Sequence, residues 1–185
     1  QTGGITALTQ RLDHFFSRYL GTIKVNQSDI LDVFNGIHFL PLDKNTYLRI
    51  QCFVNLLEAT FSQVKYTAFL YNDQLVWSGL EQDDMRILYR YLTASLFPSC
   101  LEQEFQATSS SSHYGKFIVG PVNMKDETSL GRVPRVHLSE EGNTQQCHLV
   151  VYKALSATVC LFLDGDMQLN FEYFKKLDNF LGQQM

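Results

Sequence analysis

VKYTAFLYNDQLVWSGLEQDDMRILYRYLTASLF, residues 64 to 97, contains in succession the signals for a strand, a turn, a second strand and a helix. Apolar and aromatic residues dominate 64–71 and 74–78. The two residues between these runs, Asn72 and Asp73, are types that tolerate a positive φ. This arrangement predicts a β-hairpin with a two-residue turn.

An amphipathic helix is predicted directly after the hairpin. Gly79 ends the second strand, and an apolar repeat of three and four residues then runs until Pro98. The repeat predicts a helix over 81–96 whose core-facing residues are Met85, Leu88, Leu92 and Leu96. Leu75 and Trp77 alternate onto one face of the second strand, so we expect them to be core or interface anchors and not pocket residues.

The first 62 residues have helical spacing and no strand pattern. Apolar residues recur over 6–20 and 43–61, and Asp43 is a candidate N-cap for the second of these helices. We therefore expect 1–62 to be a helical segment, either the tail of a preceding domain, which we favour, or a lid on the following one. Its apolar load predicts a chain that is unstable or self-associating alone and that gains stability with a partner.

Strand patterns return after a polar, serine-rich loop at 99–112. The Asp164-Gly165-Asp166 sequence then turns the chain into a last helix at 168–181. Strands are predicted at 114–119, 147–155 and 157–163, and 135–138 is at most a short edge strand. Residues 64–185 should therefore form an α+β domain, a five-stranded antiparallel sheet with flanking helices, in which the helices at 81–96 and 168–181 cover one face.

Charge and cysteine usage narrow the classes of partner. The formal net charge is -4 and the pI is about 5.7, so nucleic acid is not expected as a partner. No run of about 18 apolar residues is present, and no signal peptide is visible. The cysteines lack a short pairing, which favours reduced cytosolic thiols at Cys52, Cys100, Cys147 and Cys160.

Motifs for catalysis or metal binding are weak. Asp164 and Asp166 could ligate a metal, but a turn is the simpler interpretation because further oxygen ligands at regular spacing are missing. His137, Cys147 and His148 lack zinc-site spacing. We therefore assign no catalytic, metal or cofactor-binding residue. A binding or scaffold module is favoured, and a cytosolic α+β enzyme or ligand-binding domain with an unrecognised site is the alternative.

The helix at 81–96 is the candidate partner-binding element. Ile87, Tyr91 and Ala94 add apolar surface beside its core stripe, and one sheet can cover only one face of a helix. A solvated face is the competing interpretation. If the second face binds a protein, the contact residues are expected to be Asp83, Asp84, Arg86, Tyr89 and Arg90.

YTAFLYNDQLVWSGLEQDDMRILYRYL, residues 66 to 92, resembles the Ccz-one family of vacuolar fusion proteins. The similarity extends upstream through RLDHFF and RYL within 11–20 and through FLPLDKNTYLRIQ at 39–51. Downstream it includes HYGKF and GP within 113–121 and HLVVYKALSATVC at 148–160. The resemblance therefore covers most of the chain, and the long loops match least.

This resemblance implies a longin fold and a role in membrane traffic. Family members carry three longin domains, which makes 64–185 the second and 1–62 the tail of the first plus a connector. With the Mon-one subunit they form a guanine nucleotide exchange factor for a late-endosomal Rab GTPase, without hydrolytic chemistry of their own, in endosome–lysosome (vacuole) fusion. The implied partners are the matching Mon-one longin domain and a third regulatory subunit, and the implied location is cytoplasmic, peripheral on the late endosome or lysosome.

Overall fold

The computed structural model describes residues 9, 12–13, 36–99, 115–121, 130, 133–140 and 143–185. Thr9, Leu12 and Asp13 are helical, while the remainder of the helix expected over 6–20 lies outside the described residues, as does most of the serine-rich loop. The chain divides into two units, Gln1–Gly36 and Ile37–Met185, and the second unit contains all the elements described below.

The hairpin is present as predicted, with strand β1 at Val64–Tyr71 and strand β2 at Gln74–Ser78. Asn72 and Asp73 have φ values of 47° and 60°, which are the values of a type I′ turn. This turn twists in the same sense as the strands that it joins, and its chemistry explains why the hairpin could be predicted from sequence.

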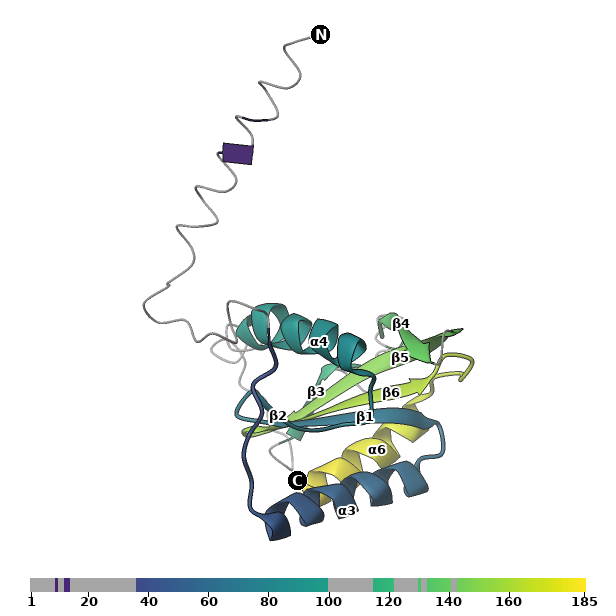
Figure 1. Cartoon of the computed structure of the whole chain (residues 1–185). Coiled ribbons are helices and arrows are strands. Elements are labelled where there is room, and N and C mark those ends of the chain that lie inside the picture. The colour runs from purple at the N-terminus through teal and green to yellow at the C-terminus, as the bar shows by residue number, and fades with distance from the viewer. Residues whose placement is uncertain are drawn as a thin grey trace. The chain divides into compact units, whose positions relative to one another are not determined.

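A six-stranded antiparallel sheet extends from this hairpin, in the order β2-β1-β6-β5-β3, with β4 paired to β5 beside that path (Figure 1). The α+β class is thus confirmed, with five strands in the main order and β4 as a sixth. The other strands are β3 at Gly115–Val119, β4 at Arg135–Glu140, β5 at Asn143–Ala154 and β6 at Ala157–Asp164.

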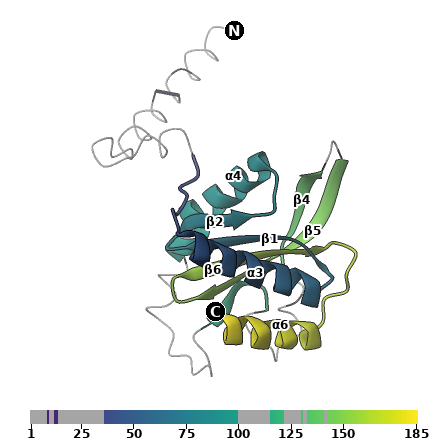
Figure 2. The ribbon, with the colours of Figure 1, turned by 60° about the horizontal axis from the view of Figure 1, so that its bottom comes forward.

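Helices cover both faces of the sheet, so the prediction that they share one face is wrong. Helix α4 (Gln82–Tyr91) lies on one face, and helices α3 (Lys44–Thr60) and α6 (Phe171–Gln184) lie side by side on the other (Figures 1 and 2). The central strands are apolar on both sides because each side is buried: Val151 packs under α4, whereas Val150 packs under α3 and α6.

Leu75 and Trp77 lie on opposite faces of the sheet, contrary to the prediction. Leu70 pairs with Leu75 and Phe69 with Trp77, so Val76 is an extra residue in β2, a β-bulge that breaks the alternation. Leu75 is buried under α4, with only 2% of its surface exposed. Trp77 is half-buried on the α3 side, 6.3 Å from the Tyr47 ring.

Helix α3 packs on the sheet within the same unit as the strands. Asp43 caps it as predicted, accepting hydrogen bonds from the backbone N–H groups of Asn45 and Thr46 at 3.0 and 3.1 Å. Phe53 on its inner side contacts Phe180 of α6, with ring centroids 6.3 Å apart. The domain division predicted near residue 62 therefore falls inside a packed unit, and the origin of α3 in a preceding longin domain stays a prediction.

The segment before α3 covers the outer edge of β2. Leu75 donates a backbone hydrogen bond to the carbonyl of His38 at 2.8 Å and accepts one from Leu40 at 2.9 Å, which makes a short parallel bridge. An exposed strand edge is a template for unwanted pairing, and this bridge blocks part of it. Phe39, at the centre of the bridge, is 65% exposed.

Candidate interaction site

Helix α4 confirms the element predicted after the hairpin. Its first turn carries acidic side chains and its last turn carries Arg90, which matches the helix macrodipole. A π-helical turn, η1 at Leu92–Leu96, follows directly, and residues 97–99 are still helical. The expectation that Pro98 ends the run is therefore wrong, because the π turn supplies the irregular hydrogen bonding that a proline within a helix requires.

The outer face of α4, defined here as Asp83, Arg86, Ile87, Arg90 and Tyr91, is exposed. Ile87 is 71% exposed and Tyr91 is 41% exposed, so the face has an apolar centre. Arg86 lies 3.8 Å from Asp83, a long contact between two exposed side chains that adds little to stability. The arginine and tyrosine side chains on this face belong to the types enriched at binding hot spots.

Two of the five predicted contact residues, Asp84 and Tyr89, make hydrogen bonds within the chain. Tyr89 is buried, with 7% exposure, and its hydroxyl donates a 2.9 Å hydrogen bond to the carbonyl of Asp73 in the hairpin turn. Asp84 accepts a 2.7 Å hydrogen bond from the backbone N–H of Ser139 in β4. Asp83, Arg86 and Arg90 therefore form the exposed part of the predicted set, and Ile87 and Tyr91 complete the face.

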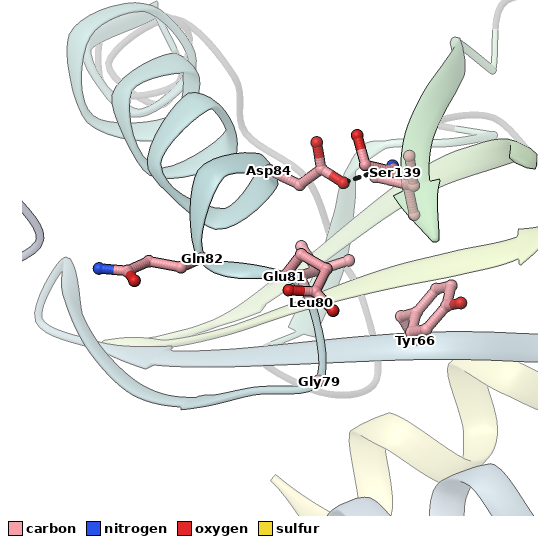
Figure 3. Close-up of a pocket in the computed structure, with 8 residues that line it drawn as sticks. Tyr66, Gly79, Leu80, Glu81, Gln82, Asp84 and Ser139 are labelled. Atoms are coloured by element: carbon pink, nitrogen blue, oxygen red, sulfur yellow. Dashed lines mark hydrogen bonds between the residues drawn. The ribbon is translucent and has the colours of Figure 1, made fainter. Parts of the chain in front are cut away.

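A pocket of about 270 Å³ lies where the start of α4 meets β4 (Figure 3). Its wall combines one aromatic ring, apolar side chains and two carboxylates, and the Asp84 carboxylate already binds Ser139. The volume is slightly below the usual range for small-molecule sites. The lining residues are Tyr66, Gly79, Leu80, Glu81, Gln82, Asp84, Leu138 and Ser139.

Comparison with protein families identifies the fold of this unit. Residues 64–182 match the family model described as Intu longin-like domain 2, which spans the hairpin, α4, all later strands and nearly all of α6. The chain belongs to this longin-like family. The longin architecture inferred from the sequence is thereby confirmed.

Curated relatives match the whole length of this longin-like chain. A vacuolar fusion protein CCZ1 homolog of Danio rerio is 52% identical over 194 residues, which cover 100% of this chain and 40% of the relative. Homologs of the same name from Nematostella vectensis and Xenopus laevis are 49% and 47% identical over 100% of the chain, and 42% and 41% of the relatives are covered. The chain therefore spans about two fifths of the length of these relatives, and the resemblance read from residues 66–92 is confirmed.

The thiols described in the longin-like unit differ in accessibility. Cys147 and Cys160 are buried in the layer between the sheet and α4, and burial raises the pKa of the Cys160 thiol, which makes it a poor nucleophile. Cys52 is exposed on α3. Cys100 lies outside the described residues.

The Asp164-Gly165-Asp166 sequence forms the predicted turn. Asp164 accepts a hydrogen bond from the backbone N–H of Asp166 at 3.1 Å and pairs with Lys65 at 3.2 Å, and both contacts lower the pKa of its carboxyl group. The cap of α6 is Asn170, which accepts from the backbone N–H of Tyr173. Within the described ranges, no group of three or more metal-ligating side chains occurs, and no helix has the length and apolarity to cross a membrane.

His148 is a buried histidine, with 4% exposure, in the middle of the sheet. Neither ring nitrogen makes a hydrogen bond of good geometry among the described residues, although the backbone of Gly165 lies close enough to act on the ring. Its strand neighbours are Leu163 on β6 and Arg135 on β4. Burial, together with the positive charge of Arg135, lowers the pKa of His148 below its ordinary value of 6.5, against smaller opposing effects of the Gly165 backbone and of Asp164.

The free energy of unfolding is therefore expected to decrease as the pH falls below 6.5, the ordinary pKa of histidine. The pKa of His148 is lower in the folded chain than in the unfolded chain, so the unfolded chain binds the proton first as the pH falls. The contribution of neutral His148 to stability is therefore fully present above pH 6.5 and is lost as the pH falls through the folded-state pKa. Urea unfolding of the wild type and of His148→Leu at about pH 7.5 and about pH 5.5 measures this loss. The leucine variant should lose less stability on acidification, and an equal loss in both proteins would rule out His148 as its source.

Proposed function

We propose that this chain is a protein-interaction part of a trafficking complex that acts in endosome–lysosome, or vacuole, fusion. The observation that carries this proposal is the identity of about 50% along the whole chain to proteins named for vacuolar fusion. The longin-like fold supports a scaffold role in place of a catalytic one. One of the two pocket carboxylates, Asp84, is already hydrogen-bonded to the backbone of Ser139. A carboxylate engaged in this way also fits a scaffold role better than a catalytic one.

A more specific proposal concerns the partner of this chain and the activity of the complex that they form. The chain pairs through the outer face of α4 with the matching longin domain of a Mon-one subunit, and a third regulatory subunit joins the same assembly. The complete complex acts as guanine nucleotide exchange factor for a late-endosomal Rab GTPase. It works in the cytoplasm and is held on the membrane of late endosomes or lysosomes as a peripheral assembly.

Charge reversal on the outer face of α4 tests the proposed pairing. Arg86→Glu combined with Arg90→Glu should weaken association with Mon-one by about tenfold or more, because reversing exposed charges at an interface slows its formation and changes its salt dependence. The melting temperature of the chain should stay nearly constant, since exposed charges contribute little to folding. Isothermal calorimetry or interferometry gives the affinity.

A matched control is available on α6. Lys175→Glu with Lys176→Glu makes the same change in net charge at exposed positions on the opposite face of the sheet, and it should leave the affinity for Mon-one unchanged. Undiminished binding by the α4 variant, or equal weakening by both variants, would refute the pairing through α4. Nucleotide release from the Rab by the complete complex should fall only with the variant that impairs assembly.

A further inference from the structure

The outward side of α3 carries an apolar stripe that the packing of the domain does not use. Leu48 is 43% exposed and Leu56 is 49% exposed, and Cys52 lies exposed midway between them. The inner side of the same helix is fully buried at Val54 and Leu57. In Figure 2, α3 lies in front of the sheet and beside α6. The helix is therefore apolar on two opposite sides.

The spacing of this α3 stripe is symmetric. Leu48 and Leu56 lie four residues before and four residues after Cys52, so the three side chains follow one another at helical spacing along the same side. If a second α3 lies antiparallel across the first with a twofold axis at Cys52, Leu48 of each copy meets Leu56 of the other. A patch that complements itself in this way is the requirement for a closed dimer with twofold symmetry.

Charges beside the stripe agree with the same arrangement. Lys44 and Glu58 lie on one flank of α3, eight residues before and six residues after Cys52. In the antiparallel pair, Lys44 of one copy and Glu58 of the other are offset along the axis by two residues, or about 3 Å, and they lie on the same side of the interface. The twofold axis produces this ion pair twice. A parallel pair would place like charges together and is disfavoured.

We propose that the α3 stripe is a self-association surface, and that two copies of this chain dimerise through antiparallel α3 helices centred on Cys52. The surface lies on the opposite side of the sheet from the outer face of α4. A chain that binds its partner through α4 can therefore dimerise through α3 at the same time, which would join two partner complexes. The proposal is independent of the pairing with Mon-one.

Cysteine crosslinking tests the geometry directly. In a Cys100→Ser chain, Cys52 is the exposed thiol, while Cys147 and Cys160 are buried. Mild oxidation should convert most of the dimer to a covalent form in which Cys52 is joined to Cys52, and Cys52→Ser should abolish this form. Sedimentation equilibrium over a range of concentrations should show a reversible dimer without oxidation. A monomer at all concentrations would overturn the proposal.

Surface variants locate the interface without disturbing the core. Leu48→Asp with Leu56→Asp should weaken the dimer by about tenfold or more, whereas Ile87→Asp, a single change of the same kind on α4, should leave it intact. Lys44→Glu should weaken the dimer, and adding Glu58→Lys to the same chain should restore it because the pairing is reversed on both sides. A dimer that resists the leucine variant, or no rescue by the charge swap, would refute this interface.

Discussion

Phe174→Ala is expected to lower the free energy of unfolding by about 3 to 5 kcal/mol, the largest effect of any change considered. Phe174 lies on α6 with 0% exposure, against the sheet. Its ring meets Phe117 of β3 edge-on, with centroids 5.6 Å apart, and Phe117 in turn meets Tyr152 at 5.0 Å. Truncation leaves a cavity bounded by two rigid layers, which cannot collapse easily to fill it.

Urea unfolding followed by circular dichroism measures this loss. Ile87→Ala provides a matched control, since Ile87 is a large apolar residue on a helix but is 71% exposed, and its stability change should stay within about 0.5 kcal/mol. The slope of the transition should be similar in all three proteins. A loss below about 1 kcal/mol for Phe174→Ala would show that α6 packs less closely on the sheet than described here.

Gly165→Ala is expected to cost about 2 to 3 kcal/mol, although it adds only one methyl group. The turn after β6 brings Gly165 against the backbone of Gln146 in β5, with a 3.1 Å hydrogen bond from the Gly165 N–H to the Gln146 carbonyl. A Cβ atom at Gly165 would lie 2.3 Å from that carbonyl oxygen. No side-chain rotation can relieve a clash with backbone, so the turn has to move.

Gly79→Ala distinguishes this steric effect from a general cost of replacing glycine. A Cβ atom at Gly79 would meet the Thr67 carbonyl oxygen at 3.5 Å, an ordinary contact, so this variant should lose less than about 1 kcal/mol. Thermal unfolding of both variants under the same conditions gives the comparison. If the two glycine variants are equally stable, the close approach at Gly165 does not constrain the fold.

The elements that the sequence predicted well are those with local causes. The turn at Asn72 and Asp73 follows from side chains that accept positive φ, and the cap at Asp43 from a carboxylate beside free backbone N–H groups. The arrangement of layers depends on contacts between distant residues. Apolar runs along β5 and β6 are compatible with coverage on both faces, but periodicity does not indicate which helix covers which face.

The bulge at Val76 shows a second limit of sequence patterns. Strict alternation puts Leu75 and Trp77 on one face, and a single extra residue in the pairing of β2 reverses that result. The bulge depends on how β2 meets β1, which leaves no local signal in the sequence. Trp77 consequently lies beside Tyr47 of α3, on the face of the sheet opposite α4.

The contacts that the candidate contact residues make within the chain could not be predicted for the same reason, and their role in partner binding stays a prediction. Residue type selected Tyr89 and Asp84 as contact residues, because tyrosine and exposed charge are common at interfaces. Their roles are set by distant partners: Tyr89 binds the carbonyl of Asp73, and Asp84 binds Ser139, which is 55 positions further along the chain. The helical repeat correctly placed Ile87 and Tyr91 on the outward side, because that position depends only on helix geometry.

The π turn at the end of α4 has a consequence for comparing longin-like sequences. Phe97 donates its backbone hydrogen bond to Leu92, five residues back, and both side chains are buried, with 3% and 0% exposure. In a regular α-helix, residues four apart lie on the same face, whereas here two buried residues on one face are five apart. The π turn therefore inserts one extra residue between these two core positions. A relative with a plain helix here should therefore align with a one-residue gap inside 92–96 and keep both core positions. Aligning the two without that gap would match core residues to exposed ones.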